Sequence, residues 1–343
     1  MADIEDFRSS VDPYGFKRTE NFDYDCYEQF MSKYLSVLAR RRSKWERILG
    51  MKANGHVVRS NKIKRYVRKG IPSVFRAQVW MEVSGAEYHR RSNPGLYEAM
   101  RIACHDKDLI EVIVTDLDRT FPDNIYFQAE TSSEKYAKRQ SLFNVLIALG
   151  QKNQKVGYCQ GLNFIAGLLL IVVKDEEKVF WLMDTLINDL LPDYYSRDML
   201  GVQTDQEVLG ELVKERMPDV TRMLDAVGVA WALVSTKWFI CLYCDVLPTE
   251  TVLRLWDCIF YEGSKVLFRV GITLVKHNRA KILNCRSFPE VVNIFKESTN
   301  DKFVINCHQF IQAIFSEPGS LSRSHIDELR EQCQQRVVDN KHH

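Results

Sequence analysis

The chain has 343 residues and a formal net charge of +2, and its 45% hydrophobic and 27% charged residues are typical of a soluble globular protein. The longest apolar run, Phe164 to Val173, is too short to span a membrane and predicts a core helix. The acidic N-terminus has neither the apolar stretch of a signal peptide nor a glycine at position two, so we expect a cytoplasmic protein.

Apolar residues recur with a helical period in nearly every segment. The first predicted helix runs from Tyr24 to Leu49, a shorter basic helix stops at Gly70, and Pro72 opens a third that ends near Gly85. Thr204 and Glu207 match a capping box ahead of a further helix. The other predicted helices are 106–119, one ending near residue 152, 164–173, 235–246, 249–261, 264–283, 287–297, 301–315 and 323–338. No stretch shows strand alternation, so the predicted fold class is all-α, a multi-helix domain without significant β-sheet.

The charge is unevenly distributed along these helices. Residues 40–70 contain twelve basic residues and one acidic residue, Glu46, so this segment carries +11 and the rest of the chain −9. Such asymmetry indicates an anionic partner, or simply a solvated helical face. Trp45 and Tyr66 are the only aromatic residues in the segment, and no zinc or RNP signature accompanies it, so we expect no nucleic acid. Weak association with anionic membranes through residues 40–70 remains as a hypothesis.

Several kinds of site have no counterpart in the sequence. There is no glycine-rich phosphate loop, no histidine pattern for a metal and no nucleophile elbow, so we expect no cofactor and no metal. The nine cysteines are odd in number and scattered, which is typical of free thiols. Only Cys241 and Cys244 have a metal-like spacing, and no second pair lies at zinc-site distance.

Two short polar clusters remain as candidate sites. In the first, Asp116 and Arg119 lie three residues apart on one helical face and can pair, which would fix the guanidinium in one rotamer. In the second, Tyr158 and Gln160 precede the apolar helix. From spacing alone, Arg119 could equally satisfy carbonyls at a helix end, and Gln160 could cap the next helix.

In order and spacing, Ile113-x-x-Asp116-x-x-Arg119 followed by Tyr158-x-Gln160 resembles the paired IxxDxxR and YxQ motifs of the TBC-domain family of Rab GTPase activators. Other family landmarks match at Arg68-Lys69-Gly70-Ile71-Pro72, Arg76, Trp80, Ser84-Gly85-Ala86, Gln160-Gly161-Leu162-Asn163, Trp238-Phe239, Leu247-Pro248, Trp256-Asp257 and Gly263. The whole chain resembles a short family member with little beyond the domain. We therefore expect a TBC domain over 66–265, an N-terminal helical extension over 1–65, and C-terminal helices over 266–343.

The resemblance implies a catalytic activator in trans and not a self-contained hydrolase. The partner, a GTP-bound Rab, would bind GTP and Mg²⁺ itself. Arg119 would neutralise charge developing on the phosphates and Gln160 would orient the attacking water, with Asp116 holding Arg119 and Tyr158 setting the Gln160 loop.

Two further features of the family pattern are expected to be structural, and one alternative function stays open. We expect Arg76 with Trp80, and Trp256 with Asp257, to belong to the core and not to the catalytic site. In the alternative, the same fold docks a Rab as a scaffold without accelerating hydrolysis.

Overall fold

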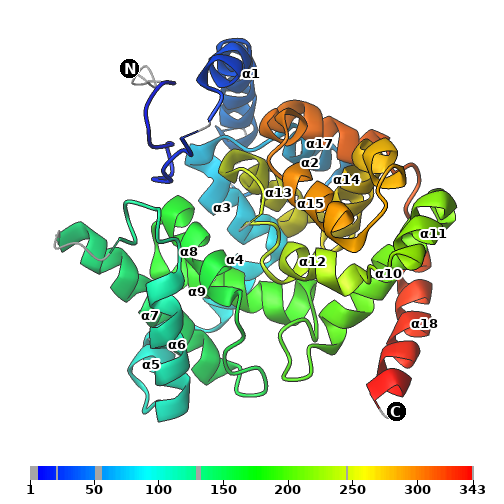
Figure 1. The fold of residues 1–343 in the computed structure, drawn as a ribbon. Helices are drawn as coiled ribbons and strands as arrows, with labels where there is room; N and C mark the ends of the chain where they lie inside the picture. The colour runs from blue at the N-terminus through cyan, green and yellow to red at the C-terminus, as the bar shows by residue number, and fades with distance from the viewer. Residues whose placement is uncertain (1–6, 21, 51–55, 129–132, 245, 342–343) are drawn as a thin grey trace. The chain divides into compact units, whose positions relative to one another are not determined.

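The computed structural model describes residues 7–20, 22–50, 56–128, 133–244 and 246–341. These residues form helices and no strand, which confirms the predicted all-α class (Figure 1). The chain divides into two compact units, Met1–Thr185 and Leu186–His343.

The first unit consists of nine helices among its described residues. They are α1 (Tyr24–Gly50), α2 (Asn61–Lys69), α3 (Ser73–Ser84), α4 (Ala86–Ser92), α5 (Leu96–Ile102), α6 (Lys107–Arg119), α7 (Ser133–Lys152), α8 (Leu162–Val173) and α9 (Glu176–Thr185). Ser60 caps α2 by accepting a hydrogen bond from the Ile63 amide, and Asp106 caps α6 in the same way through the Asp108 amide.

The core of this unit is built around α8, which is green in Figure 1. Its sequence is almost entirely apolar, and it packs against α3, α6, α7 and α9. Gly167 permits the close approach to the end of α6, because a Cβ there would lie 3.1 Å from the Phe121 ring. The apolar run that was predicted to be too short to span a membrane is therefore a core helix. No single helix among the described residues is long and apolar enough to cross a membrane.

The second unit begins with a π-helical turn, η1 (Leu186–Leu190). Its α-helices are α10 (Leu200–Arg216), α11 (Pro218–Ala226), α12 (Trp231–Ile240), α13 (Thr249–Glu262), α14 (Lys265–Leu283), α15 (Phe288–Ser298), α16 (Lys302–Ile305), α17 (Cys307–Ser316) and α18 (Arg323–Lys341). Helix α14 packs against α10, α11, α12, α13, α15 and α17 and forms the centre of this core.

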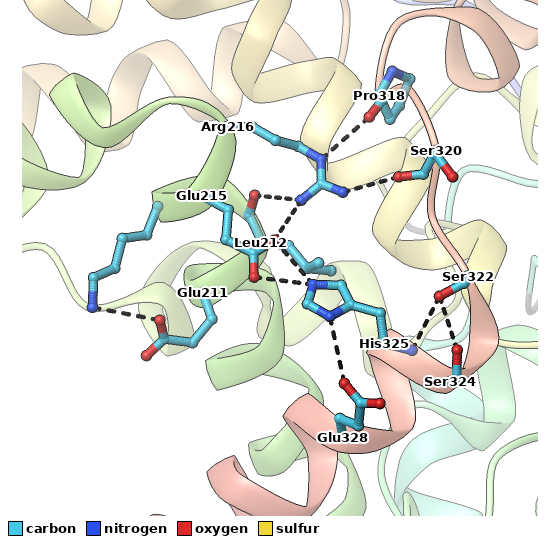
Figure 2. A network of polar contacts seen from close by, with 11 residues as sticks. Glu211, Leu212, Glu215, Arg216, Pro318, Ser320, Ser322, Ser324, His325 and Glu328 are labelled. Carbon is cyan, nitrogen blue, oxygen red and sulfur yellow. Dashed lines mark hydrogen bonds and ion pairs between the residues drawn. The ribbon is translucent and has the colours of Figure 1, made fainter.

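The C-terminal helix α18 is attached to α10 by polar contacts along its length. Arg330 donates two hydrogen bonds of 2.7 Å to the buried carboxylate of Asp205 on α10. At the start of α18, His325 lies between Glu215 of α10 and Glu328, and Arg216 donates to the carbonyls of the segment leading into the helix (Figure 2). The predicted helix over 323–338 is thus an integrated part of the second unit.

Three helix predictions in the second unit were wrong. Helix α10 begins at Leu200, so Thr204 is a buried residue inside it and not its cap. Helix α12 ends at Ile240, before the expected 246, because Leu242 and Tyr243 adopt positive φ angles in a turn. The expected single helix over 301–315 is broken at Asn306, whose side chain caps α17.

Candidate functional site

The four predicted site residues lie in the first unit, on two segments joined through α7. Asp116 and Arg119 occupy the last turn of α6. Tyr158 and Gln160 lie in the irregular segment between α7 and α8. The tyrosine precedes the glutamine by two residues, and the glutamine precedes α8 by two.

The expected ion pair between Asp116 and Arg119 is present. Arg119 Nη2 contacts Asp116 Oδ1, and no other ion-pair partner of Arg119 occurs in the described part of the chain. The carboxylate side chain is 3% exposed, whereas the guanidinium side chain is 49% exposed. A buried anion therefore holds one nitrogen of the guanidinium, while the arginine side chain stays half-exposed to solvent.

The same carboxylate also holds the second segment. The Tyr158 hydroxyl donates a 2.5 Å hydrogen bond to Asp116 Oδ2. Burial, together with this hydrogen bond and the charge of Asp116, raises the pKa of the Tyr158 hydroxyl far above its usual value. The phenol therefore remains a proton donor, and Asp116 links the arginine and the glutamine segments.

Gln160 is exposed, and its side chain has no hydrogen bond to another described residue. The residue that caps α8 is Gly161, whose φ of 106° favours glycine. The simpler interpretation, a capping glutamine, is therefore wrong. Likewise, the contact that the structure gives Arg119 is to a carboxylate and not to a helix-end carbonyl.

Two buried side chains that we did not predict to be functional connect the segments further. Thr120 Oγ1 donates to the Asp116 carbonyl at 2.6 Å and accepts from Asn163 Nδ2 at 2.8 Å. Asn163 Oδ1 in turn accepts from the Gly161 amide at 3.1 Å. Asn163 is fully buried in the first turn of α8. An asparagine within an apolar helical run was the sequence signal for this bridge, because such a group needs buried partners.

Cys159 lies between Tyr158 and Gln160 and is half-buried. Burial, reinforced by the negative charge of Asp116, raises the pKa of its thiol to about 11. The thiol is therefore neutral near pH 7 and adds no charge beside Gln160.

Chemically, the site offers one fixed cation and one exposed neutral amide. It offers no cluster of His, Cys, Asp or Glu that could hold a metal ion in the residues that the structure describes. A cation and a neutral amide of this kind can bind an anionic group and orient a water molecule.

The residues that we expected to be structural are buried. Arg76 and Trp80 lie in the first core, where Arg76 donates to the Tyr14 hydroxyl at 3.0 Å. In the second core, Trp256 donates to the Leu242 carbonyl, and Asp257 faces Arg254 at 3.8 Å. Neither pair belongs to the cluster around Asp116.

Comparison with known proteins gives one consistent family. The Rab-GTPase-TBC domain family model matches residues 73–283. Growth hormone-regulated TBC protein 1-A from Danio rerio is 52% identical over 330 residues, covering 96% of this chain and 91% of its own. Growth hormone-regulated TBC protein 1 from Homo sapiens is 50% identical, with 96% of each chain covered.

A solved structure supports the same assignment. The crystal structure of the Chlamydomonas flagellar RabGAP TBC domain is 29% identical, with a TM-score of 0.75, and covers 90% of this chain and 100% of that one. The resemblance predicted from the motifs, and the resemblance of the whole chain to a short family member, are both confirmed. The domain boundaries at residues 66 and 265 stay a prediction, since the family match runs on to residue 283.

Proposed function

The chain belongs to the Rab-GTPase-TBC domain family, and from this membership and the geometry around Asp116 we propose that it accelerates GTP hydrolysis by a Rab-type small GTPase. The partner brings GTP and Mg²⁺, and this chain brings two side chains. GTP would be hydrolysed on the partner, so this chain acts as an activator in trans. The setting of this reaction would be vesicle trafficking.

In this proposal, Arg119 neutralises charge that develops on the phosphates. A small GTPase alone hydrolyses GTP slowly because this charge is poorly stabilised, and an arginine supplied by a partner raises the rate by about 10³ to 10⁵. The guanidinium suits this role, because Asp116 holds one of its nitrogens and the side chain is half-exposed to solvent. Little ordering is then left to occur when the GTPase docks.

Gln160 would position the attacking water. Its exposed amide can both donate and accept, which is what orienting a water against a phosphate requires. The backbone that carries it is fixed on both sides, by Tyr158 on Asp116 and by Gly161 on Asn163. The observation that carries the proposal is this shared anchor, which holds together two segments that each present a solvent-facing side chain.

A non-catalytic scaffold is the alternative. A scaffold would need the docking surface alone, and nothing in docking requires a buried carboxylate to hold both segments. The chain retains the arginine and the glutamine, which favours the activator.

The deciding experiment measures phosphate release from a panel of GTP-loaded Rab proteins with wild-type protein, Arg119→Ala and Gln160→Ala. Acceleration by the wild type that both variants lose supports the proposal. Tight binding of one Rab without acceleration of any would instead support the scaffold.

We further propose that the protein acts in the cytoplasm and rests weakly on anionic membranes. The basic segment 40–70 is only partly available for this. Arg41 is buried and donates to the Tyr34 hydroxyl, Arg42 pairs with Glu46, and Lys52 lies outside the described residues. Exposed basic residues remain on α1 and α2, opposite the buried Trp45 and Val67, at Lys44, Arg47, Lys62, Arg65 and Lys69.

The membrane proposal can be tested with Lys62→Glu/Lys69→Glu in low salt, using vesicles that contain phosphatidylserine. Each basic residue near such a surface contributes about 1 kcal/mol, so this variant should bind at least about tenfold more weakly. The matched control is Lys281→Glu/Lys296→Glu, which makes the same charge change on the second unit. Equal binding of the wild type and the Lys62/Lys69 variant would contradict the proposal.

A further inference from the structure

An N-terminal segment outside the family match lies against the loop that follows Arg119. The Ile125 amide donates to the Gly15 carbonyl at 2.9 Å, and the Lys17 amide donates to the Asp123 carbonyl at 3.2 Å. These bonds pair residues 15–17 with 123–125 in an antiparallel manner, with a bridge between Phe16 and Asn124. Two segments more than 100 residues apart in the chain are therefore joined in the loop that directly follows the candidate arginine.

The side chain of Asn124 reinforces this pairing. Its Nδ2 donates to the Tyr14 carbonyl at 3.0 Å, and its Oδ1 accepts from the Tyr126 amide at 2.9 Å. Asn124 is fully buried. Gly15 is required at the contact, because its φ is 88° and a Cβ there would lie 2.6 Å from the Tyr126 ring.

The segment reaches the end of α6 through aromatic packing. Phe16 packs edge-on against Phe121 with ring centroids 5.0 Å apart, and Phe121 packs in the same way against Phe164 of α8 at 5.3 Å. Phe121 follows Arg119 by two residues and has a φ of 48°, a conformation that a bulky residue adopts only when its surroundings hold it. Phe16 is one of the groups that hold it.

The N-terminal segment is itself ordered by local contacts. Asp12 Oδ1 accepts hydrogen bonds from the amides of Tyr14 and Phe16, which closes a tight turn. Arg18 donates to the Phe7 and Ser9 carbonyls. A turn already shaped in this way presents the Phe16 ring at a fixed position.

From these contacts we propose that residues 12–17 are a positioning element for Arg119, with Phe16 as the positioning residue, so that the N-terminal extension is part of the activating machinery. The inference deepens the proposed function and rests on it. Phe16 touches neither Arg119 nor a substrate. It acts by fixing Phe121, which sets where α6 ends and hence where the guanidinium points. A displacement of about 1 Å at a reacting group can lower a rate by about a hundredfold.

The test compares Phe16→Ala with Phe22→Ala in the full chain. Phe22 is a half-buried phenylalanine of the same extension. Its ring packs against the rings of Tyr24 and Tyr27 and not against an aromatic ring of the Arg119 loop. Phosphate release is measured over a range of concentrations of the responsive GTP-loaded Rab, so that kcat and KM separate. Hydrogen exchange of residues 117–127 is measured on the same proteins.

For Phe16→Ala we expect kcat to fall about tenfold, a part of the loss that a 1 Å displacement causes, with KM unchanged and faster exchange at Asn124 and Ile125. Phe22→Ala should match the wild type in both measurements, and Phe16→Leu should recover most of kcat. Wild-type kcat in Phe16→Ala overturns the inference, even if exchange rises, and leaves the proposed function intact. If the wild type accelerates no Rab, the proposed function fails. Hydrogen exchange then tests only whether residues 12–17 hold the loop after Arg119, and unchanged exchange of residues 117–127 in Phe16→Ala overturns that as well.

Discussion

The hydroxyl of Tyr158 donates a 2.5 Å hydrogen bond to Oδ2 of Asp116, across 42 residues of sequence. The other oxygen of this carboxylate pairs with Arg119. Because Tyr158 precedes Gln160 by two residues, one buried anion sets the position of both proposed catalytic side chains. Asp116 therefore does more than hold the arginine, which was the role expected from its spacing alone.

Asp116→Ala should lower the rate of activated GTP hydrolysis less than Arg119→Ala does, yet destabilise the fold more. Removing the carboxylate loosens Arg119 without deleting its charge, and it leaves the partly buried Tyr158 hydroxyl without its acceptor, at a cost of about 1–3 kcal/mol. Arg119 is half-exposed, so its truncation should lower the stability of the fold only a little. Phosphate release should rank Arg119→Ala as the less active variant, and thermal unfolding should rank Asp116→Ala as the less stable one. The prediction fails if Arg119→Ala proves the less stable protein.

Arg119→Lys should lose nearly all activation, as Arg119→Ala does. A lysine keeps the charge but cannot hold Asp116 with one edge and present a planar pair of donors with the other. We expect a loss of at least about 10³-fold in the activated rate, with binding to the GTP-loaded Rab retained. Substantial activation by Arg119→Lys would show that charge alone suffices.

Asn163→Ala should reduce activation through the Gln160 segment. The substitution frees the Gly161 amide and removes the donor to Thr120, so the backbone beside Gln160 gains freedom. We expect kcat to fall several-fold with KM unchanged, and a loss of about 1–3 kcal/mol of stability from the unpaired buried groups. Thr120→Ser, which keeps the hydroxyl, is the control and should remain close to wild type. Equal kcat in Asn163→Ala and wild type would limit Asn163 to a structural role.

The sequence predicted six of the nine helices of the first unit, α1, α2, α3, α6, α7 and α8, because each of these carries its own signals, whereas α4, α5 and α9 were not predicted. Gly70 and Pro72 mark the end of α2 and the beginning of α3, and the apolar run of α8 could only be a core helix. The errors lie where tertiary contacts override local pattern. Thr204 resembles a cap, but α10 continues through it because the segment is buried on both sides.

The candidate site was predictable in part for a similar reason. The pairing of Asp116 with Arg119 follows from helical spacing, so it could be predicted from one segment. The contacts of Asp116 with Tyr158 and of Thr120 with Asn163 join residues more than 40 positions apart. No local pattern encodes such contacts, and the pairing of Phe16 with Asn124 is more distant still.

Arg330→Ala should destabilise the second unit far more than Arg336→Ala. Both side chains tie α18 to α10, but Asp205 is 1% exposed whereas Glu211 is 23% exposed. Stranding a buried carboxylate costs about 3 kcal/mol, which corresponds to a fall of about 6–12 °C in the unfolding midpoint for a unit of this size. The pair formed by Arg336 is nearer the surface and should contribute at most about 1 kcal/mol. Thermal unfolding followed by circular dichroism separates the two, and similar midpoints would contradict the assignment of Arg330 as the main anchor.

Cys159 should resist alkylation at neutral pH and become reactive only in strong alkali. Its thiol has a raised pKa of about 11, chiefly through burial and secondarily through Asp116, so the reactive thiolate is scarce at lower pH. Because the folded-state pKa lies above the unfolded value, the thiol favours the folded state at low pH, and this contribution is lost as pH rises from about 9 towards 11.

The measurement is the iodoacetamide reaction of each cysteine between pH 7 and 11, followed by mass spectrometry, with the exposed Cys104 as the internal reference. Asp116→Asn removes the nearby charge and should shift the Cys159 midpoint to lower pH, by less than burial shifts it upward. Modified Cys159 should also abolish activation, because the adduct lies next to Gln160. Reaction of Cys159 as fast as Cys104 at pH 8 would show that the segment opens in solution, and the shared anchor on Asp116 would then not hold Gln160 in place.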